Sequence, residues 1–237
     1  MSTIIYLSTL FEKKKNFASF LAVLGLILLL IILEPDLGTT LIVTISAVYL
    51  FFIAGASLKE MFVVFLFGIV TIIPLVFFSP YRRQRVINYF RASSDIQTTS
   101  YHVKQILIAL GSGGLLGRGF GQSRQKFLFL PEVATDSIFA VIAEEFGLLG
   151  SSALVLAMVF LFNRGFKIAG GGVDFFGRIL SGGIIFFLAL QAIINLSSIV
   201  SLIPLTGVPL PFISYGGSSL LVSLSGIGIV YNISKQS

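Results

Sequence analysis

The stretch "FASFLAVLGLILLLIILEPDLGTTLIVTISAVYLFFIAG", residues 17–55, decides the fold class. It contains two apolar runs, residues 17–33 and 37–55, which are separated only by the polar triplet Glu34–Asp36. Each run reaches the roughly 17–25 residues that an α-helix needs to cross a bilayer. The stretch therefore predicts two membrane-spanning helices joined by a short loop.

The same signal recurs along the chain, at about residues 60–78, 137–162, 176–203 and 213–233. Residues 3–11 are too short to span a bilayer and resemble the end of a helix whose beginning is missing. Of the 237 residues, 56% are hydrophobic and 11% are charged, and a soluble domain would need more polar surface. We expect an all-α integral membrane protein, a polytopic bundle of about six transmembrane helices forming one domain over residues 1–237.

Basic residues in the short loops predict the orientation. Because each predicted span crosses the membrane once, successive loops alternate between its two sides. One side then contains Lys13–Lys15, Lys59, Arg164, Lys167, Arg178 and Lys235. The opposite short loops, Glu34–Asp36 and Pro204–Ser214, contain no Lys or Arg. The positive-inside rule makes the lysine-rich side cytoplasmic and the long connection, residues 79–136, extracytoplasmic. The membrane topology accounts for the positions of the basic residues that give the net charge of +6. We therefore expect no nucleic-acid partner.

The long outer loop is itself basic, which predicts an anionic binding partner. Its candidate substrate-binding side chains are Arg82, Arg83, Arg85, Lys104, Arg118, Arg124 and Lys126. Within it, "YHVKQILIAL" has apolar residues at i, i+3, i+4 and i+7 and predicts an amphipathic surface helix. The following "GSGGLLGRGFGQSRQK" suits close approach to a phosphate, although a flexible turn and basic contacts to lipid headgroups fit equally well.

Carboxylates stand where this loop meets the next apolar helix. Asp136 is a candidate for the N-cap of that helix or, alternatively, for a role in catalysis. Thr135 is the other candidate for the N-cap. Glu144 and Glu145 lie two helical turns deeper, where ionisable groups either face a functional cavity or satisfy structural hydrogen bonds. Proline and glycine residues in "TGVPLPFISYGG" predict a corner before the last span, with Ser214 and Tyr215 facing the outer cavity.

Three blocks carry a family resemblance: "LEPDLGTTLIV", "YHVKQILIALGSGGLLGRGFGQSRQKFLFLPEVATDSIFAVIAEEFGLLGS" and "LIPLTGVPLPFISYGGSSLL". Together they closely resemble the shape, elongation, division and sporulation family of FtsW, RodA and SpoVE. The segment "GFGQSRQKFLFLPE" resembles the FtsW and SpoVE branch more than RodA. Members of the family have ten transmembrane helices with both termini in the cytoplasm. The resemblance therefore implies that the first three helices and most of the fourth are missing here.

The resemblance also implies a function. The family polymerises lipid II, an undecaprenyl-pyrophosphate disaccharide-pentapeptide, into glycan strands outside the bacterial cytoplasmic (inner) membrane. Asp136 matches its essential loop aspartate and would be the general base, while Ala134 and Ser137 depart from the usual family pattern. Glu144 and Glu145 would polarise or brace the cavity beneath Asp136, and the loop cations would hold pyrophosphate. A divalent cation, Mg²⁺ or Mn²⁺, is expected without a readable ligand set.

Partners follow from the same resemblance: lipid II, a class B penicillin-binding transpeptidase, and divisome or elongasome proteins. Two other functions remain open. A lipid II flippase would use Glu144, Glu145 and the glycine-bearing helices as a polar path. A non-catalytic scaffold for the transpeptidase would need no chemistry, and a truncated chain fits this reading more readily than a complete one.

Overall fold

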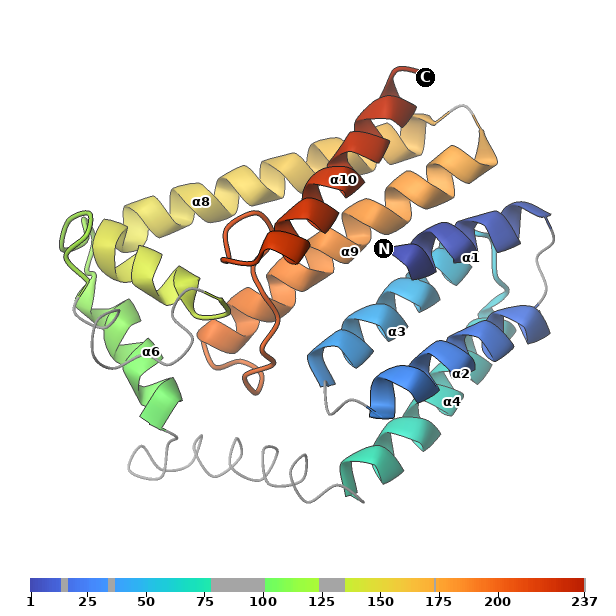
Figure 1. Cartoon of the computed structure of the whole chain (residues 1–237), viewed down its shortest axis with the longest axis horizontal. Coiled ribbons are helices and arrows are strands. Elements are labelled where there is room, and N and C mark those ends of the chain that lie inside the picture. Colours follow the sequence, from blue (N-terminus) through green and yellow to red (C-terminus); the bar gives the residue numbers. More distant parts are fainter. Residues whose placement is uncertain (14–16, 34–36, 78–100, 124–134, 173, 237) are drawn as a thin grey trace. The chain divides into compact units, whose positions relative to one another are not determined.

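The computed structural model describes residues 1–13, 17–33, 37–77, 101–123, 135–172 and 174–236, where every regular element is an α-helix (Figure 1). In chain order the helices are α1 (Ser2–Lys13), α2 (Phe17–Leu33), α3 (Leu37–Ile53), α4 (Leu58–Phe77), α6 (Tyr101–Ser112), α8 (Ile138–Gly171), α9 (Phe175–Ile199) and α10 (Gly217–Ser234). A helix lies at each of the six predicted spans. The all-α polytopic membrane fold is therefore confirmed.

Among the described residues, α8, α9 and α10 are each long and apolar enough to cross a membrane. Both α2 and α3 have 17 residues, which is near the lower limit for a span. Helix α4 has 20 residues. Helix α6 confirms the helix predicted within the long connection, but its buried side chains are Ile106 and Ala109, whereas Leu107 from the predicted apolar stripe is 45% exposed.

The helices group into two compact units, which we describe separately. The first unit comprises Met1–Thr71, Phe160–Gln191 and Ser218–Ser237, and the second comprises Ile72–Val159 and Ala192–Gly217. All the predicted site residues that the structure describes belong to the second unit. The expectation of a single membrane domain stays a prediction.

Aromatic side chains fill the core of the first unit where α3 packs against α1 and α2. The rings of Phe20 and Phe51 stack with their centroids 4.4 Å apart. Phe11 from α1 lies 5.9 Å from the Phe20 ring and 5.8 Å from the Phe51 ring. Such ring pairs add a favourable contact to the burial of apolar area. One aromatic residue from each helix thus joins the three helices.

Local backbone bonds set the helix ends, several of which differ from the predicted limits. Ser57 and Glu60 form a capping box at the start of α4, with Ser57 N donating to Glu60 Oε2 and Glu60 N donating to Ser57 Oγ. Helix α9 ends at Ile199 rather than at 203, because Ser201 adopts a positive φ of 61°. Leu202 N then donates to Ser197 O and Ser201 N to Ser198 O, the bonding pattern of a Schellman motif.

Two further differences, in α8 and α10, have separate causes. Helix α8 continues to Gly171 rather than ending near 162, because the polar residues that follow the apolar run are compatible with a helix outside the hydrocarbon. Helix α10 begins at Gly217 rather than at 213. The preceding residues form a turn in which Ile213 N and Ser214 N both donate to Leu210 O.

Candidate active site

The candidate catalytic residue Asp136 lies in the turn before α8 and is 8% exposed. The Thr135 hydroxyl donates to Asp136 Oδ1 over 3.1 Å. Because α8 begins at Ile138 and Ala140 N donates to Ser137 O, Ser137 stands at the N-cap position. Among the described residues, no backbone amide donates to the Asp136 carboxylate. The N-cap interpretation of Asp136 therefore receives no support from the geometry.

The chemical capacity of Asp136 follows from its oxygens. Oδ1 accepts the Thr135 hydroxyl, whereas Oδ2 accepts no hydrogen bond from the part of the chain that the structure describes. Gly207, whose φ is 71°, lies beside this oxygen: a Cβ added there would be 4.0 Å from Oδ2. A carboxylate oxygen in such a place can accept a proton from a hydroxyl group that reaches it.

Asn195 of α9 connects this turn to the segment Pro204–Ser214. Its side chain is fully buried, and its Nδ2 donates to Asp136 O over 2.9 Å and to Val208 O over 2.8 Å. Sequence reasoning missed this residue. A detectable signal was present, because an amide within an apolar span must find hydrogen-bond partners there.

The two predicted residues at the end of this segment differ in their surroundings. Ser214 is 7% exposed, and its Oγ accepts a hydrogen bond from Leu210 N over 2.7 Å. Its hydroxyl thus stabilises the turn in its own segment. Tyr215 is 80% exposed and can meet a ligand or lipid. A role for either residue in substrate binding stays a prediction.

The glutamate pair contacts the segment Gly113–Ser123, which we call the glycine loop. Glu144 is fully buried, its Oε2 accepts the Ser123 hydroxyl over 2.6 Å, and its Oε1 lies 3.5 Å from Nη1 of Arg118. Glu145 is 6% exposed and accepts Gly121 N at Oε2 over 3.0 Å and Ser123 N at Oε1 over 3.3 Å. These contacts match the structural alternative for the pair, since both carboxylates bind groups of the loop.

Helix α8 is kinked at Gly147, whose φ of 66° and ψ of −166° lie outside the helical region. The kink separates Glu144 O and Glu145 O from the amides of Leu148 and Leu149, their ordinary partners four residues on. Instead, Arg118 N donates to Glu144 O and Gly119 N donates to Glu145 O, both over 3.0 Å. The sequence analysis did not predict this kink.

The freed amides beyond the kink also bond to the glycine loop. Leu148 N donates to Gly114 O over 2.9 Å, and Leu149 N donates to Leu115 O over 3.2 Å. Figure 1 shows this loop, after α6, beside the first turns of α8. The loop therefore supplies hydrogen-bond partners to the backbone groups of α8 that the kink leaves without helical partners, on both sides of the kink.

Three glycines make this close approach possible. A Cβ on Gly113 would collide with Ala143 O, one on Gly117 with Glu145 O, and one on Gly147 with Gly117 N. The glycine pattern of the sequence predicts either a phosphate cradle or a flexible turn. The geometry gives these three glycines another use, because they bring the loop backbone against that of α8.

The predicted basic residues are only partly described. Arg118 is about one-third exposed and is paired with Glu144, while Lys104 is exposed on α6. Five further predicted residues lie outside the described residues: Arg82, Arg83, Arg85, Arg124 and Lys126. A common pyrophosphate site for the whole set therefore stays a prediction.

The described residues do not fit the expected divalent-cation site. They contain no group of three or more His, Cys, Asp or Glu side chains that could hold a metal ion. The carboxylates of Glu144 and Glu145 are already bonded to the glycine loop, and they lie two helical turns from Asp136. The prediction of Mg²⁺ or Mn²⁺ stays without a ligand set.

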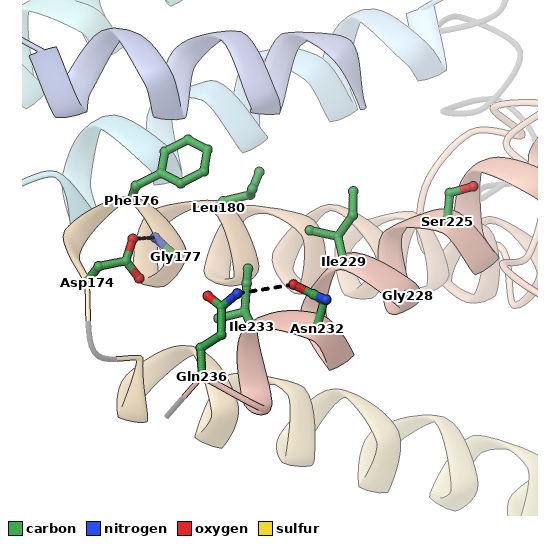
Figure 2. A pocket seen from close by; sticks show the side chains of 10 residues that line it. All are labelled: Asp174, Phe176, Gly177, Leu180, Ser225, Gly228, Ile229, Asn232, Ile233 and Gln236. Atoms are coloured by element: carbon green, nitrogen blue, oxygen red, sulfur yellow. Dashed lines mark hydrogen bonds between the residues drawn. The ribbon is translucent and has the colours of Figure 1, made fainter.

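The first unit contains a pocket of about 490 Å³ between the start of α9 and the end of α10. In Figure 2, Asp174 accepts a hydrogen bond from Gly177 N at the start of α9, and Gln236 donates to Asn232 on α10. Asp174 thus caps α9. None of the predicted site residues lines this pocket, so it is not the candidate active site.

Comparisons with known proteins were consistent across sequence and structure. The family model described as "Cell cycle protein", named for FtsW, RodA and SpoVE, matches residues 2–237. The stage V sporulation protein E of Bacillus subtilis is 40% identical over 95% of this chain and 64% of its own length. The peptidoglycan glycosyltransferase MrdB of Escherichia coli is 39% identical over 92% of this chain and 60% of its own length.

A chain in a solved peptidoglycan synthase complex that coordinates polymerization and crosslinking is 26% identical, with a TM-score of 0.75 over 99% of this chain and 67% of that chain. This chain spans less than two thirds of the length of the two curated relatives. These comparisons do not test the assignment to the FtsW-like branch, which stays a prediction. The match over residues 2–237 shows that this chain belongs to the family of cell cycle proteins named for FtsW, RodA and SpoVE.

Proposed function

We propose that this chain carries the catalytic centre of a peptidoglycan glycosyltransferase that polymerises lipid II, with Asp136 as its general base. One observation carries the assignment: the Asp136 carboxylate lies beside Gly207 with Oδ2 accepting no hydrogen bond from the described residues. The E. coli relative is a peptidoglycan glycosyltransferase by name, which supports the reaction class.

The reaction transfers a sugar between two lipid-linked substrates. The 4-hydroxyl oxygen of one sugar attacks the anomeric carbon of the other, forming the glycosidic bond with inversion. Asp136 accepts the proton of this hydroxyl, and the bond from the anomeric carbon to the pyrophosphate oxygen breaks. The undecaprenyl pyrophosphate leaves as an anion. Proton transfer to a positioned base typically contributes roughly 10²–10⁴-fold to the rate.

The glutamates and the loop cations have separate parts in this proposal. Glu144 and Glu145 hold the glycine loop against α8, so they support the site rather than take the proton. Arg118 and Lys104 are the described cations that can approach pyrophosphate. The five basic residues outside the described residues would complete the anion site.

The proposal includes a location and a partner. The basic short loops support a cytoplasmic-membrane protein with Asp136 on the extracytoplasmic side. The solved relative belongs to a complex that couples polymerization and crosslinking. This supports a transpeptidase partner, for which a class B penicillin-binding protein has the required chemistry. Divisome or elongasome proteins would be further partners.

The test compares two activities of the purified protein: glycan-strand formation from lipid II, and lipid II translocation across vesicles. Asp136→Asn should abolish strand formation, because the amide cannot accept the proton, while thermal stability stays near that of the parent. Strand formation by Asp136→Asn at the parent rate contradicts the base assignment. A parent protein that translocates lipid II without polymerising it would be a flippase, and one with neither activity would match the scaffold alternative.

A further inference from the structure

Asn195 is a buried side chain whose hydrogen bonds lead out of its own helix. Its two donors reach carbonyl oxygens 59 and 13 residues away in the sequence, those of Asp136 and Val208. Its Oδ1 has no hydrogen-bond partner in the described part of the chain. An amide turned the other way would place Oδ1 against both carbonyl oxygens, so the two acceptors determine its orientation.

The first of these bonds restrains the residue that carries the proposed base. The carbonyl direction of Asp136 depends on its ψ angle, and the same Cα carries its Cβ and carboxylate. A bond of 2.9 Å from Asn195 to this carbonyl therefore limits how far the carboxylate can swing. Within the described residues, the Asp136 carboxylate accepts only the Thr135 hydroxyl, at Oδ1, so the direction of the carboxylate depends on the backbone.

The second bond restrains the opposite side of the same space. Asn195 also holds Val208 O over 2.8 Å, and the residue before Val208 is Gly207, which lies beside Asp136 Oδ2. A single fully buried amide thus fixes the relative places of the Asp136 turn and the Gly207 backbone.

We propose that Asn195 is a positioning residue that sets the Asp136 carboxylate against the Gly207 segment, without contacting the substrate. This inference rests on the proposed function, because it takes Asp136 as the base. Misplacing a catalytic group by about 1 Å can cost roughly 10²-fold in rate. Loss of Asn195 should therefore lower kcat rather than raise KM.

The kinetic test uses Asn195→Ala and Asn195→Ser, with Ser198→Ala as the matched control. Ser198 lies one turn along the same helix and is 5% exposed, and its hydroxyl donates only to Asn195 O within the described residues. We expect Asn195→Ala to lower kcat by roughly 10–100-fold, with KM within about threefold of the parent. Asn195→Ser, which retains one donor, should fall between the parent and Asn195→Ala.

A second measurement does not depend on catalysis. The chain contains no cysteine, so Asp136→Cys introduces a single thiol at the position of the base. Its alkylation rate by a small maleimide reports how well this position is held, because 136 is almost buried. Adding Asn195→Ala should raise the alkylation rate several-fold, whereas adding Ser198→Ala should leave it unchanged.

The two measurements separate the inference from the proposed function. An Asn195→Ala protein with the kcat and alkylation rate of Ser198→Ala overturns the positioning role, as does a change confined to KM. If Asp136→Asn keeps the parent activity while Asn195→Ala still raises alkylation, the base assignment fails and the connection through Asn195 stands. If Asn195→Ala does not fold, Asn195→Ser decides between the same outcomes.

Discussion

Replacing Gly147 by alanine should destabilise the joint between α8 and the glycine loop. At a φ of 66° and ψ of −166°, a non-glycine residue costs about 1–3 kcal/mol. The new Cβ would also collide with Gly117 N and with Leu115 O. The helix can escape this strain only by straightening, which separates it from the loop.

The cost of straightening can be worked from the hydrogen bonds. Four backbone bonds between α8 and the loop are lost, and the helix regains two, from Leu148 N to Glu144 O and from Leu149 N to Glu145 O. The net loss of two bonds costs about 1–3 kcal/mol. Keeping the strained backbone at position 147 and straightening the helix thus each cost about 2 kcal/mol of stability. This loss lowers the Tm of a protein of this size by about 4–8 °C.

The assay is thermal unfolding of the detergent-purified variants, together with hydrogen exchange at the amides of Arg118 and Gly119. Gly111→Ala is the matched control, because a Cβ at Gly111 on α6 meets nothing within 4 Å. Gly147→Ala should have the lower Tm and the faster exchange at both amides. Equal stability and exchange in the two variants would refute the role assigned to the kink.

Three further outcomes test other parts of the molecule. A cysteine in place of Gln97 should react with an impermeant thiol reagent outside intact cells, whereas one in place of Asn163 should not, because positive-inside parity puts them on opposite sides. Arg82→Ala and Arg124→Ala should weaken lipid II binding by about 1.5–3 kcal/mol per charge-assisted bond, with normal membrane insertion. Glu145→Gln should lower the free energy of unfolding by about 1.5–3 kcal/mol, because one loop amide loses its carboxylate acceptor.

The controls make these outcomes decisive. Reversed labelling at the two cysteines would overturn the topology and with it the outer position of the site. Lys59→Ala, a basic residue on the side predicted to be cytoplasmic, should leave lipid II binding unchanged. The anion site fails if Arg82→Ala and Arg124→Ala behave in the same way. Glu12→Gln, an exposed residue of α1, should not change stability, and an equal result for Glu145→Gln would contradict its structural role.

Hydropathy predicts the helices of this protein well, because a bilayer-crossing helix must carry a long apolar run. The ends are less predictable. The end of α9 depends on a positive φ at Ser201, and no apolar pattern signals that a serine adopts it. The kink at Gly147 depends in turn on a loop that comes earlier in the chain and supplies the missing bonds.

The candidate site was predictable in its carboxylates but not in their surroundings. Asp136 stood out because it joins a loop to an apolar helix. Glu144 and Glu145 stood out as charges within an apolar run, yet the sequence left open whether they face a cavity or a structural partner. Asn195 was missed because its two acceptors are backbone carbonyls, and every sequence contains such groups at every position.

The four hydrogen bonds that join Gly114, Leu115, Arg118 and Gly119 to α8 connect backbone groups only. They therefore depend on the number of residues in this part of the loop rather than on its side chains. Leu115 and Leu116 are 67% and 79% exposed, and their side chains can be exchanged without disturbing the paired amides and carbonyls. Removing one residue between Gly114 and Gly119 would instead shift the donors against the acceptors. In a mutational library this segment should accept many substitutions at the leucines and almost no insertions or deletions.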